Sequence, residues 1–309
     1  MSIAVSTPVT IRSCCAPVNA ARGSVANQEI PVMESGSAGS FAGQSVSDTT
    51  FQSPALATKN QGADAFEMKC LLDEATATAL EKQLASQLQI DQFCARSDSG
   101  QYQIITLATD TSDYSVFKRS PGFGQRKFRV RRYGSESWGY LERKTRRGNR
   151  VRKIRSKIDL SELVKLQEPA LEESDSWEGD WFRMAVRQRM LQPVCLMSYE
   201  RRAWFGNSEN GPVRLTFDRN LLAGLTSGWS TDASGLVLPV TDRSVICEFK
   251  FSGAMPVLFK SAIQQFGLNP GGFSKYRHCL SRLTGMSLPA STEPTAPGDP
   301  ASPGSSIDA

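Results

Sequence analysis

The chain has 309 residues, of which 39% are hydrophobic, and it carries a formal net charge of +5. Its single histidine, His278, excludes the usual histidine-activated nucleophiles and most zinc sites. No apolar run reaches the roughly 18 residues of a membrane-spanning helix. The seven scattered cysteines form no CxxC pair, which favours a reduced, cytoplasmic compartment.

Both ends of the chain differ in composition from its middle. Residues 1–62 are rich in Ser, Ala, Gly, Thr and Val, and residues 286–309 are rich in Pro, Ser and Gly. Neither stretch has a sustained hydrophobic period, so both are predicted to be disordered tails. The remaining residues, 63–285, are enough for one domain with a sizeable core.

Alternation of apolar and polar residues predicts four strands in the first half of the domain, at 65–71, 101–109, 126–133 and 138–145. Asp73 is expected to cap a helix over 73–90. Residues 146–158 are expected to extend the last of these strands into another basic segment.

The second half is predicted to mix helices and strands. Helices are expected from Asp159 to Leu166, near Trp181–Leu191, and from Pro256 to Gly267. Four further strands are expected at 194–205, 212–218, 235–240 and 244–251. Residues 272–283 close the domain.

Positive charge is concentrated in the middle of the chain. From Lys118 to Lys157 there are sixteen Lys or Arg and only two acids, Glu136 and Glu142. Such a basic segment indicates an anionic partner: phosphate, nucleic acid or lipid headgroup.

Strand alternation places these charges on one face. Successive side chains of a strand point to opposite sides, so Lys127, Arg129 and Arg131 lie opposite Phe128 and Val130. For one strand alone, a solvated charged face is the simpler interpretation.

The same design in several strands favours another interpretation, an antiparallel barrel with a polar interior. An interior lined by Lys and Arg suits phosphates. The carboxylates of Glu67, Glu142 and Glu248 would then suit Mg²⁺ or Mn²⁺.

Seven short motifs occur in order between residues 65 and 280, and together they resemble the VTC domain. This is the polyphosphate-polymerase domain of the triphosphate tunnel metalloenzyme, or CYTH-like, superfamily. The resemblance implies an α+β fold, an eight-stranded antiparallel β tunnel with flanking helices. The motifs are FEMK (66–69), KFRVRRYG (127–134), YLERK (140–144), YERRAWF (199–205), VRLTFD (213–218), ICEFKF (246–251) and FSKY (273–276).

The resemblance also implies an activity, transfer of the γ-phosphate of ATP onto a growing inorganic polyphosphate chain. Glu248 is implied to hold the metal, Mn²⁺ or Mg²⁺. The implied catalytic cations are Lys69, Arg129, Arg131, Lys144, Arg201 and Arg214. Substrate binding is assigned to Lys127, Lys153, Lys250, Lys275, Glu67 and Glu142. Arg155 is an alternative to Lys153, and strand alternation predicts that Arg202 points away from the tunnel.

One departure from the superfamily pattern bears on the reaction. The triphosphatases of the superfamily carry an ExExK signature on the first strand, and here the first Glu is replaced by Ala65. This change favours the polymerase branch. Fungal relatives also have a membrane segment and a further regulatory domain, so a free-standing soluble version is expected here.

Two other functions stay open at this stage. A tunnel triphosphatase would use water as the acceptor in the same interior. A non-catalytic protein would bind polyphosphate or RNA without consuming ATP. Sites for single-stranded nucleic acid usually interleave aromatic residues. On the basic faces only Tyr133 and Tyr199 are found, so nucleic acid is not the expected partner.

Overall fold

The structure, a computed structural model, describes residues 65–147, 150–168 and 176–289. These residues belong to one compact unit of the chain. The tails predicted at 1–62 and 286–309 lie outside the described residues, except for 286–289, and the domain boundaries stay predictions.

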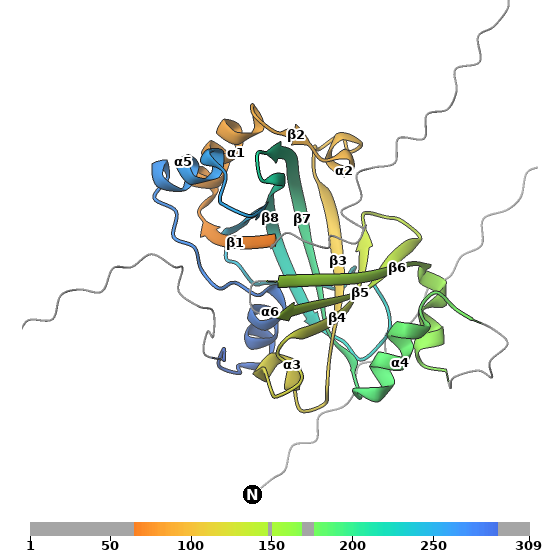
Figure 1. Cartoon of the computed structure of the whole chain (residues 1–309). Helices are drawn as coiled ribbons and strands as arrows, with labels where there is room; N and C mark the ends of the chain where they lie inside the picture. The colour runs from red at the N-terminus through yellow and green to blue at the C-terminus, as the bar shows by residue number, and fades with distance from the viewer. Residues whose placement is uncertain (1–64, 148–149, 169–175, 290–309) are drawn as a thin grey trace, which may run out of the picture. The chain divides into compact units, whose positions relative to one another are not determined.

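A single antiparallel sheet of ten strands dominates the described part of the chain (Figure 1). Eight strands form a continuous path in the order β1-β10-β8-β7-β3-β4-β5-β6, while β2 pairs with β7 and β9 pairs with β8. The strands are β1 (Ala65–Leu72), β2 (Gln89–Ile90), β3 (Tyr102–Asp110), β4 (Arg126–Tyr133), β5 (Trp138–Arg147), β6 (Arg150–Asp159), β7 (Gln192–Ser208), β8 (Gly211–Leu225), β9 (Leu238–Pro239) and β10 (Val245–Ser252).

Helices flank this sheet, and two begin at an aspartate that the sequence identified. Asp73 caps the first helix, accepting a hydrogen bond from the backbone N–H of Thr76. Asp159 and Glu162 form a capping box at the start of the 3₁₀ helix. The helices are α1 (Glu74–Ala85), α2 (Gln92–Ala95), α3 (Ser115–Lys118), η1 (Leu160–Leu166, 3₁₀), α4 (Asp180–Gln188), α5 (Val257–Gln265) and α6 (Lys275–Thr284).

The α+β class and the antiparallel sheet with flanking helices are confirmed, but strand count and closure differ from the expectation. The sheet has ten strands rather than eight, because two short strands of two residues each, β2 and β9, pair with β7 and β8 beside the main path. It is not closed: within the described residues no backbone ladder joins β1 to β6. A side-chain contact bridges the gap instead, since Lys144 of β5, the neighbour of the end strand β6, lies 2.8 Å from Glu67 of β1.

Several element boundaries also differ from the sequence prediction. Residues 146–158 do not simply extend the preceding strand: β6 is a separate strand, antiparallel to β5. The strand predicted at 212–218 continues to Leu225, and the segment at 272–283 contains α6. Strand β2 and the short helices α2 and α3 have no counterpart among the elements predicted from the sequence.

Two apolar clusters support the sheet. One packs α1 and α5 against β1, β8 and β10, with Leu80, Phe249 and Phe259 fully buried. The other packs α4, η1 and α6 against β3, β4, β5 and β7. Most of these residues alternate with charged ones along their strands, so the charged residues lie on the opposite face.

No helix in the described ranges is both long and apolar enough to cross a membrane.

The packing of α5 generates a first prediction. The ring of Phe259 is 0% exposed and lies edge-on to Phe249, with ring centroids 5.0 Å apart. Phe259→Ala should lower the free energy of unfolding by about 3–5 kcal/mol, because it leaves a cavity. Denaturant unfolding measures the loss. Val257→Ala, at a residue 73% exposed on the same helix, is the control. Equal losses in the two variants would contradict this packing.

Candidate functional site

The charged side chains singled out in the sequence lie on one face of the curled sheet, here called the inner face. Directly opposed residues of antiparallel strands project to the same side. Eleven of the thirteen predicted site residues are placed on this face by the pairs Lys69–Glu248, Glu67–Lys250, Lys250–Arg214, Arg201–Asp218, Arg129–Glu142, Lys127–Lys144 and Lys144–Lys153. Arg131 lies on the same face, opposite Thr106 of β3 in the ladder. Lys275 of α6 reaches this face by pairing with Asp218.

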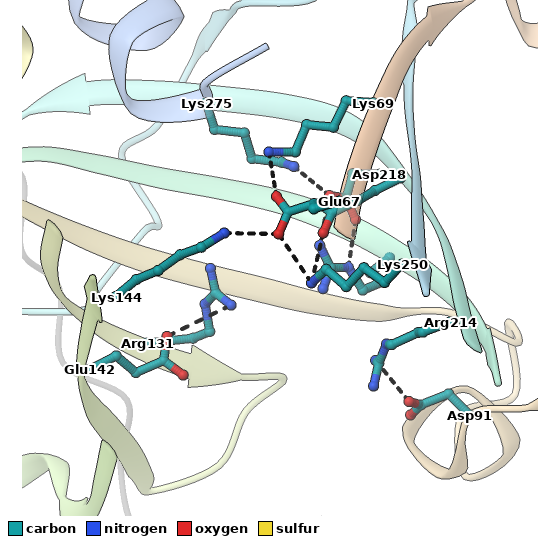
Figure 2. A network of polar contacts seen from close by, with 12 residues as sticks. Glu67, Lys69, Asp91, Arg131, Glu142, Lys144, Arg214, Asp218, Lys250 and Lys275 are labelled. Carbon is teal, nitrogen blue, oxygen red and sulfur yellow. Dashed lines mark hydrogen bonds and ion pairs between the residues drawn. The ribbon is translucent and has the colours of Figure 1, made fainter. Parts of the chain in front are cut away.

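Glu67 lies at the centre of a cluster of lysines (Figure 2). Its carboxylate oxygens lie 2.6 Å from Lys69 Nζ, 2.8 Å from Lys144 Nζ and 3.8 Å from Lys250 Nζ. Burial alone would raise the pKa of Glu67, but these lysines hold it well below its ordinary value. Glu67 is therefore a carboxylate that links β1, β5 and β10.

Glu248 is the predicted metal ligand, and it is a buried neighbour of this cluster. Its Oε1 lies 2.6 Å from Lys250 Nζ. Burial and the nearby Glu67 both raise the pKa of Glu248, but Lys250, Lys69 and Arg201 outweigh them and lower it to about 2. The group is thus an ionised carboxylate at neutral pH.

Glu142 gathers the cations of the central basic strands. Its carboxylate is 0% exposed and lies 2.7 Å from a guanidinium nitrogen of Arg129 and 3.9 Å from Arg131 Nη1, and it also pairs with Lys153. Burial would raise the pKa of Glu142, but Arg129, Arg131 and Lys153 lower it. Lys153 pairs with Glu142, and Arg155 is the ladder partner of Glu142 on the same face, so the choice between the two as a phosphate contact stays a prediction.

Two aspartates of the site were missed by the sequence analysis. Asp218 accepts hydrogen bonds from Arg201 Nε at 2.6 Å and Nη2 at 2.8 Å, and it lies 2.5 Å from Lys275 Nζ. Asp91, just before α2, lies 2.8 Å from Arg214 Nη2. For Asp218 a signal existed, since alternation puts it on the same face as Arg214. Asp91 lay outside every predicted motif.

Lys127 is held in strongly positive surroundings. Its Nζ donates to Ser274 Oγ at 3.2 Å, and it makes no ion pair with a carboxylate of the described residues. Burial, with the charges of Arg277, Lys69 and Lys144, holds the pKa of Lys127 well below its ordinary value. An anion bound here would favour the protonated form.

Arg202 lies on the other face of β7, as alternation predicted. Its guanidinium pairs with Glu81 of α1 at 2.8 Å. It belongs to the interface between α1 and the sheet rather than to the inner face.

Aromatic residues are more frequent on the inner face than the sequence analysis found. Besides Tyr133 and Tyr199, the strand registers place Tyr102, Trp138 and Tyr140 there. The prediction that the basic faces hold only two aromatic residues is therefore wrong, and it gives no reason to exclude base stacking on this face.

The donor chemistry of the inner face fits a divalent metal ion. Among the described residues no group of three or more His, Cys, Asp or Glu side chains is placed to hold a metal. Glu67 and Glu248 nevertheless offer two ionised carboxylates on adjacent strands. Mg²⁺ characteristically binds one or two carboxylates and completes its shell with phosphate oxygens and water. The two glutamates fit that pattern if a phosphate ligand is present.

A search of solved structures matches the chain to several proteins of low sequence identity. A Bacillus halodurans protein described as a candidate adenylate cyclase is 15% identical, with a TM-score of 0.40; the match covers 68% of this chain and 95% of that one. A Hippeastrum candidate adenylyl cyclase, described as having a dominant triphosphatase activity, is 14% identical, with a TM-score of 0.41 and coverages of 71% and 96%. No curated protein matches the chain.

The model of the VTC domain matches residues 64–284, which include every site residue described above. This span is most of the chain, and it agrees with the resemblance carried by the seven motifs. The protein belongs to the VTC domain family.

Proposed function

We propose that this protein is a metal-dependent polyphosphate polymerase, which transfers the γ-phosphate of ATP to a growing inorganic polyphosphate chain on the inner face. The observation that carries the proposal is the excess of partly buried cations over carboxylates on that face. The inner-face cations include Lys69, Lys127, Arg129, Arg131, Lys144, Lys153, Arg201, Arg214, Lys250 and Lys275, and the carboxylates among them are Glu67, Glu142, Asp218 and Glu248.

Several of these cations are oriented before any substrate binds. Arg201 donates two hydrogen bonds to Asp218, and Arg129 donates one to Glu142. Phosphoryl transfer spreads negative charge over the equatorial oxygens of the transferred group. Guanidinium groups fixed in position stabilise that charge without having to reorganise during the reaction.

The acceptor in this reaction needs little activation. A terminal phosphate oxygen of polyphosphate is already anionic, so no strong general base is required. The chain's one histidine is not used: Nδ1 of His278 lies 2.9 Å from the Ser274 carbonyl oxygen, and its ring stacks on Phe273.

Glu248, with Glu67 beside it, would hold Mn²⁺ or Mg²⁺. When bound, such an ion polarises phosphoryl oxygens and neutralises their charge. The lysines around Glu67 would then shift from the carboxylate to the phosphates, because these carry more negative charge.

The cellular setting belongs to the same proposal. The five described cysteines are unpaired and buried, in keeping with the cytoplasmic location expected from the sequence.

Product analysis tests the reaction directly. The purified chain, incubated with ATP and Mn²⁺, should form long polyphosphate that appears as a ladder on a stained gel. Free phosphate without polymer would instead identify a triphosphatase. Tight polyphosphate binding with no consumption of ATP would identify a binding protein.

Glu248→Gln tests the metal role. The change removes the ionised carboxylate but keeps its shape, so metal-dependent kcat should fall by about 100-fold or more, while nucleotide binding changes much less. Steady-state kinetics and calorimetry measure the two effects. Glu200→Gln, on the opposite face of β7, should leave kcat unchanged. An unchanged kcat in Glu248→Gln would exclude the metal role.

The lowered pKa of Lys153 predicts that the affinity for phosphate depends on pH. Burial, with repulsion from Arg129 and Arg131, outweighs Glu142 and lowers the pKa of Lys153 to about 7. The amine is therefore charged below that pH and loses its charge as the pH rises, which weakens its attraction for phosphate. Lys153→Arg keeps the charge throughout.

Calorimetric titration with inorganic triphosphate from about pH 6 to about pH 9 compares the two proteins. The affinity of the wild type relative to Lys153→Arg should fall by about 10-fold over this range, as one charge-assisted contact is lost. Protonation of the triphosphate itself affects both proteins equally, so it cancels in the ratio of the two affinities at each pH. Parallel pH profiles would show that Lys153 does not contact the phosphates.

A further inference from the structure

Five aromatic side chains form a contiguous group, here called the aromatic row: Phe93, Tyr102, Tyr133, Tyr140 and Trp138. Ring centroids are 5.5 Å apart for Trp138 and Tyr140, 5.9 Å for Tyr140 and Tyr133, and 5.4 Å for Tyr133 and Phe93. Tyr102 packs against both Phe93 and Tyr133. The row thus runs across β5, β4 and β3 to α2.

The aromatic row adjoins the phosphate-binding cations. Tyr140 is the direct partner of Arg131 in the ladder of β4 and β5, and Glu142, which binds Arg129, is the next inner residue along β5. Two residues of a strand span about 7 Å. At the other end of the row, Tyr102 is the partner of Arg201, and its hydroxyl accepts a hydrogen bond from Arg214 Nη2 at 3.4 Å.

The end of the row formed by Trp138 and Tyr140 is accessible and carries its own cations. Both rings are only partly buried, whereas Tyr102 is 8% exposed. The guanidinium carbon of Arg155 lies 4.5 Å from the Tyr140 ring centroid, and Lys157 Nζ lies 4.1 Å from that of Trp138. Neither cation forms an ion pair with a carboxylate in the described ranges. Both can therefore move to a ligand without breaking a salt bridge.

From this geometry we propose that the end of the aromatic row at Trp138 and Tyr140 binds the base of a free nucleotide whose triphosphate lies on Arg129, Arg131 and Lys153. Bases stack on aromatic rings and on guanidinium planes, and this stacking tolerates any base. Arg155 and Tyr140 provide one surface of each kind, side by side. The position of the phosphates rests on the proposed function, but binding of the base can be measured without turnover.

The experiment compares two ligands that differ in the nucleoside alone. Calorimetry without divalent metal gives the Kd of the full chain for ATP and for inorganic triphosphate. Tyr140→Leu removes the aromatic ring and keeps an apolar side chain. It should weaken ATP binding by about 10-fold to 100-fold and leave the affinity for inorganic triphosphate unchanged. Tyr140→Trp keeps an aromatic ring and should retain the wild-type ratio of the Kd for ATP to the Kd for inorganic triphosphate.

A matched control lies away from the row. Phe123 also has a guanidinium over its ring, that of Arg189 at 5.2 Å, but it belongs to another part of the domain. Phe123→Leu should alter neither Kd. The unchanged affinity of Tyr140→Leu for inorganic triphosphate shows at the same time that the variant is folded.

The outcomes separate this inference from the proposed function. If Tyr140→Leu weakens ATP and inorganic triphosphate equally, or neither, the row does not bind a base and the proposal is overturned. If ATP binding depends on Tyr140 but no polymer forms, the base site stands and the polymerase assignment fails. If the wild type binds neither ligand in this metal-free assay, the base site is overturned, whereas the polymerase assignment is decided by product analysis with Mn²⁺. Tighter binding of a 5′-triphosphorylated oligoribonucleotide than of ATP would overturn the assignment to a free nucleotide.

Discussion

Carboxylates that bind cations from more than one element hold the inner face together, and the geometry of the site depends on them. Glu67 joins β1 to β5 and β10, Glu142 joins β5 to β4 and β6, and Asp218 joins β8 to β7 and α6. Lysines and arginines crowded on a curled sheet repel one another, and this repulsion is strongest where water is partly excluded. Each buried carboxylate offsets part of it and fixes the distance between strands.

These links also explain how the sheet curls without closing. The backbone ladder ends at β1 and at β6, yet Lys144 meets Glu67 across the gap. A contact between side chains can rearrange when a ligand arrives, whereas a ladder of backbone hydrogen bonds cannot do so without unpairing strands. Part of the perimeter of the inner face is therefore closed by ion pairs that a ligand can replace.

The charge left uncompensated gives the site its preference for anions. Lys127 shows this most directly, since burial and neighbouring cations lower its pKa while no described carboxylate pairs with it. A bound anion would supply the missing negative charge, so ligand binding would also stabilise the folded state.

The sequence by itself determined which side chains share a face, because the period of a strand is two and needs no knowledge of neighbours. Lys127, Arg129 and Arg131 were grouped in this way, and the motifs around them pointed to the VTC domain family. The sequence also marked Asp73 and Asp159 as helix caps, since capping depends on residues three apart.

Only the tertiary structure decided which faces meet. That Lys144 reaches Glu67, that Asp91 binds Arg214 and that the rings of Tyr102 and Tyr133 touch are consequences of strand order, register and curl. These contacts join residues tens to more than a hundred positions apart along the chain. Pairing between distant strands sets them, and no local pattern of residues encodes that pairing.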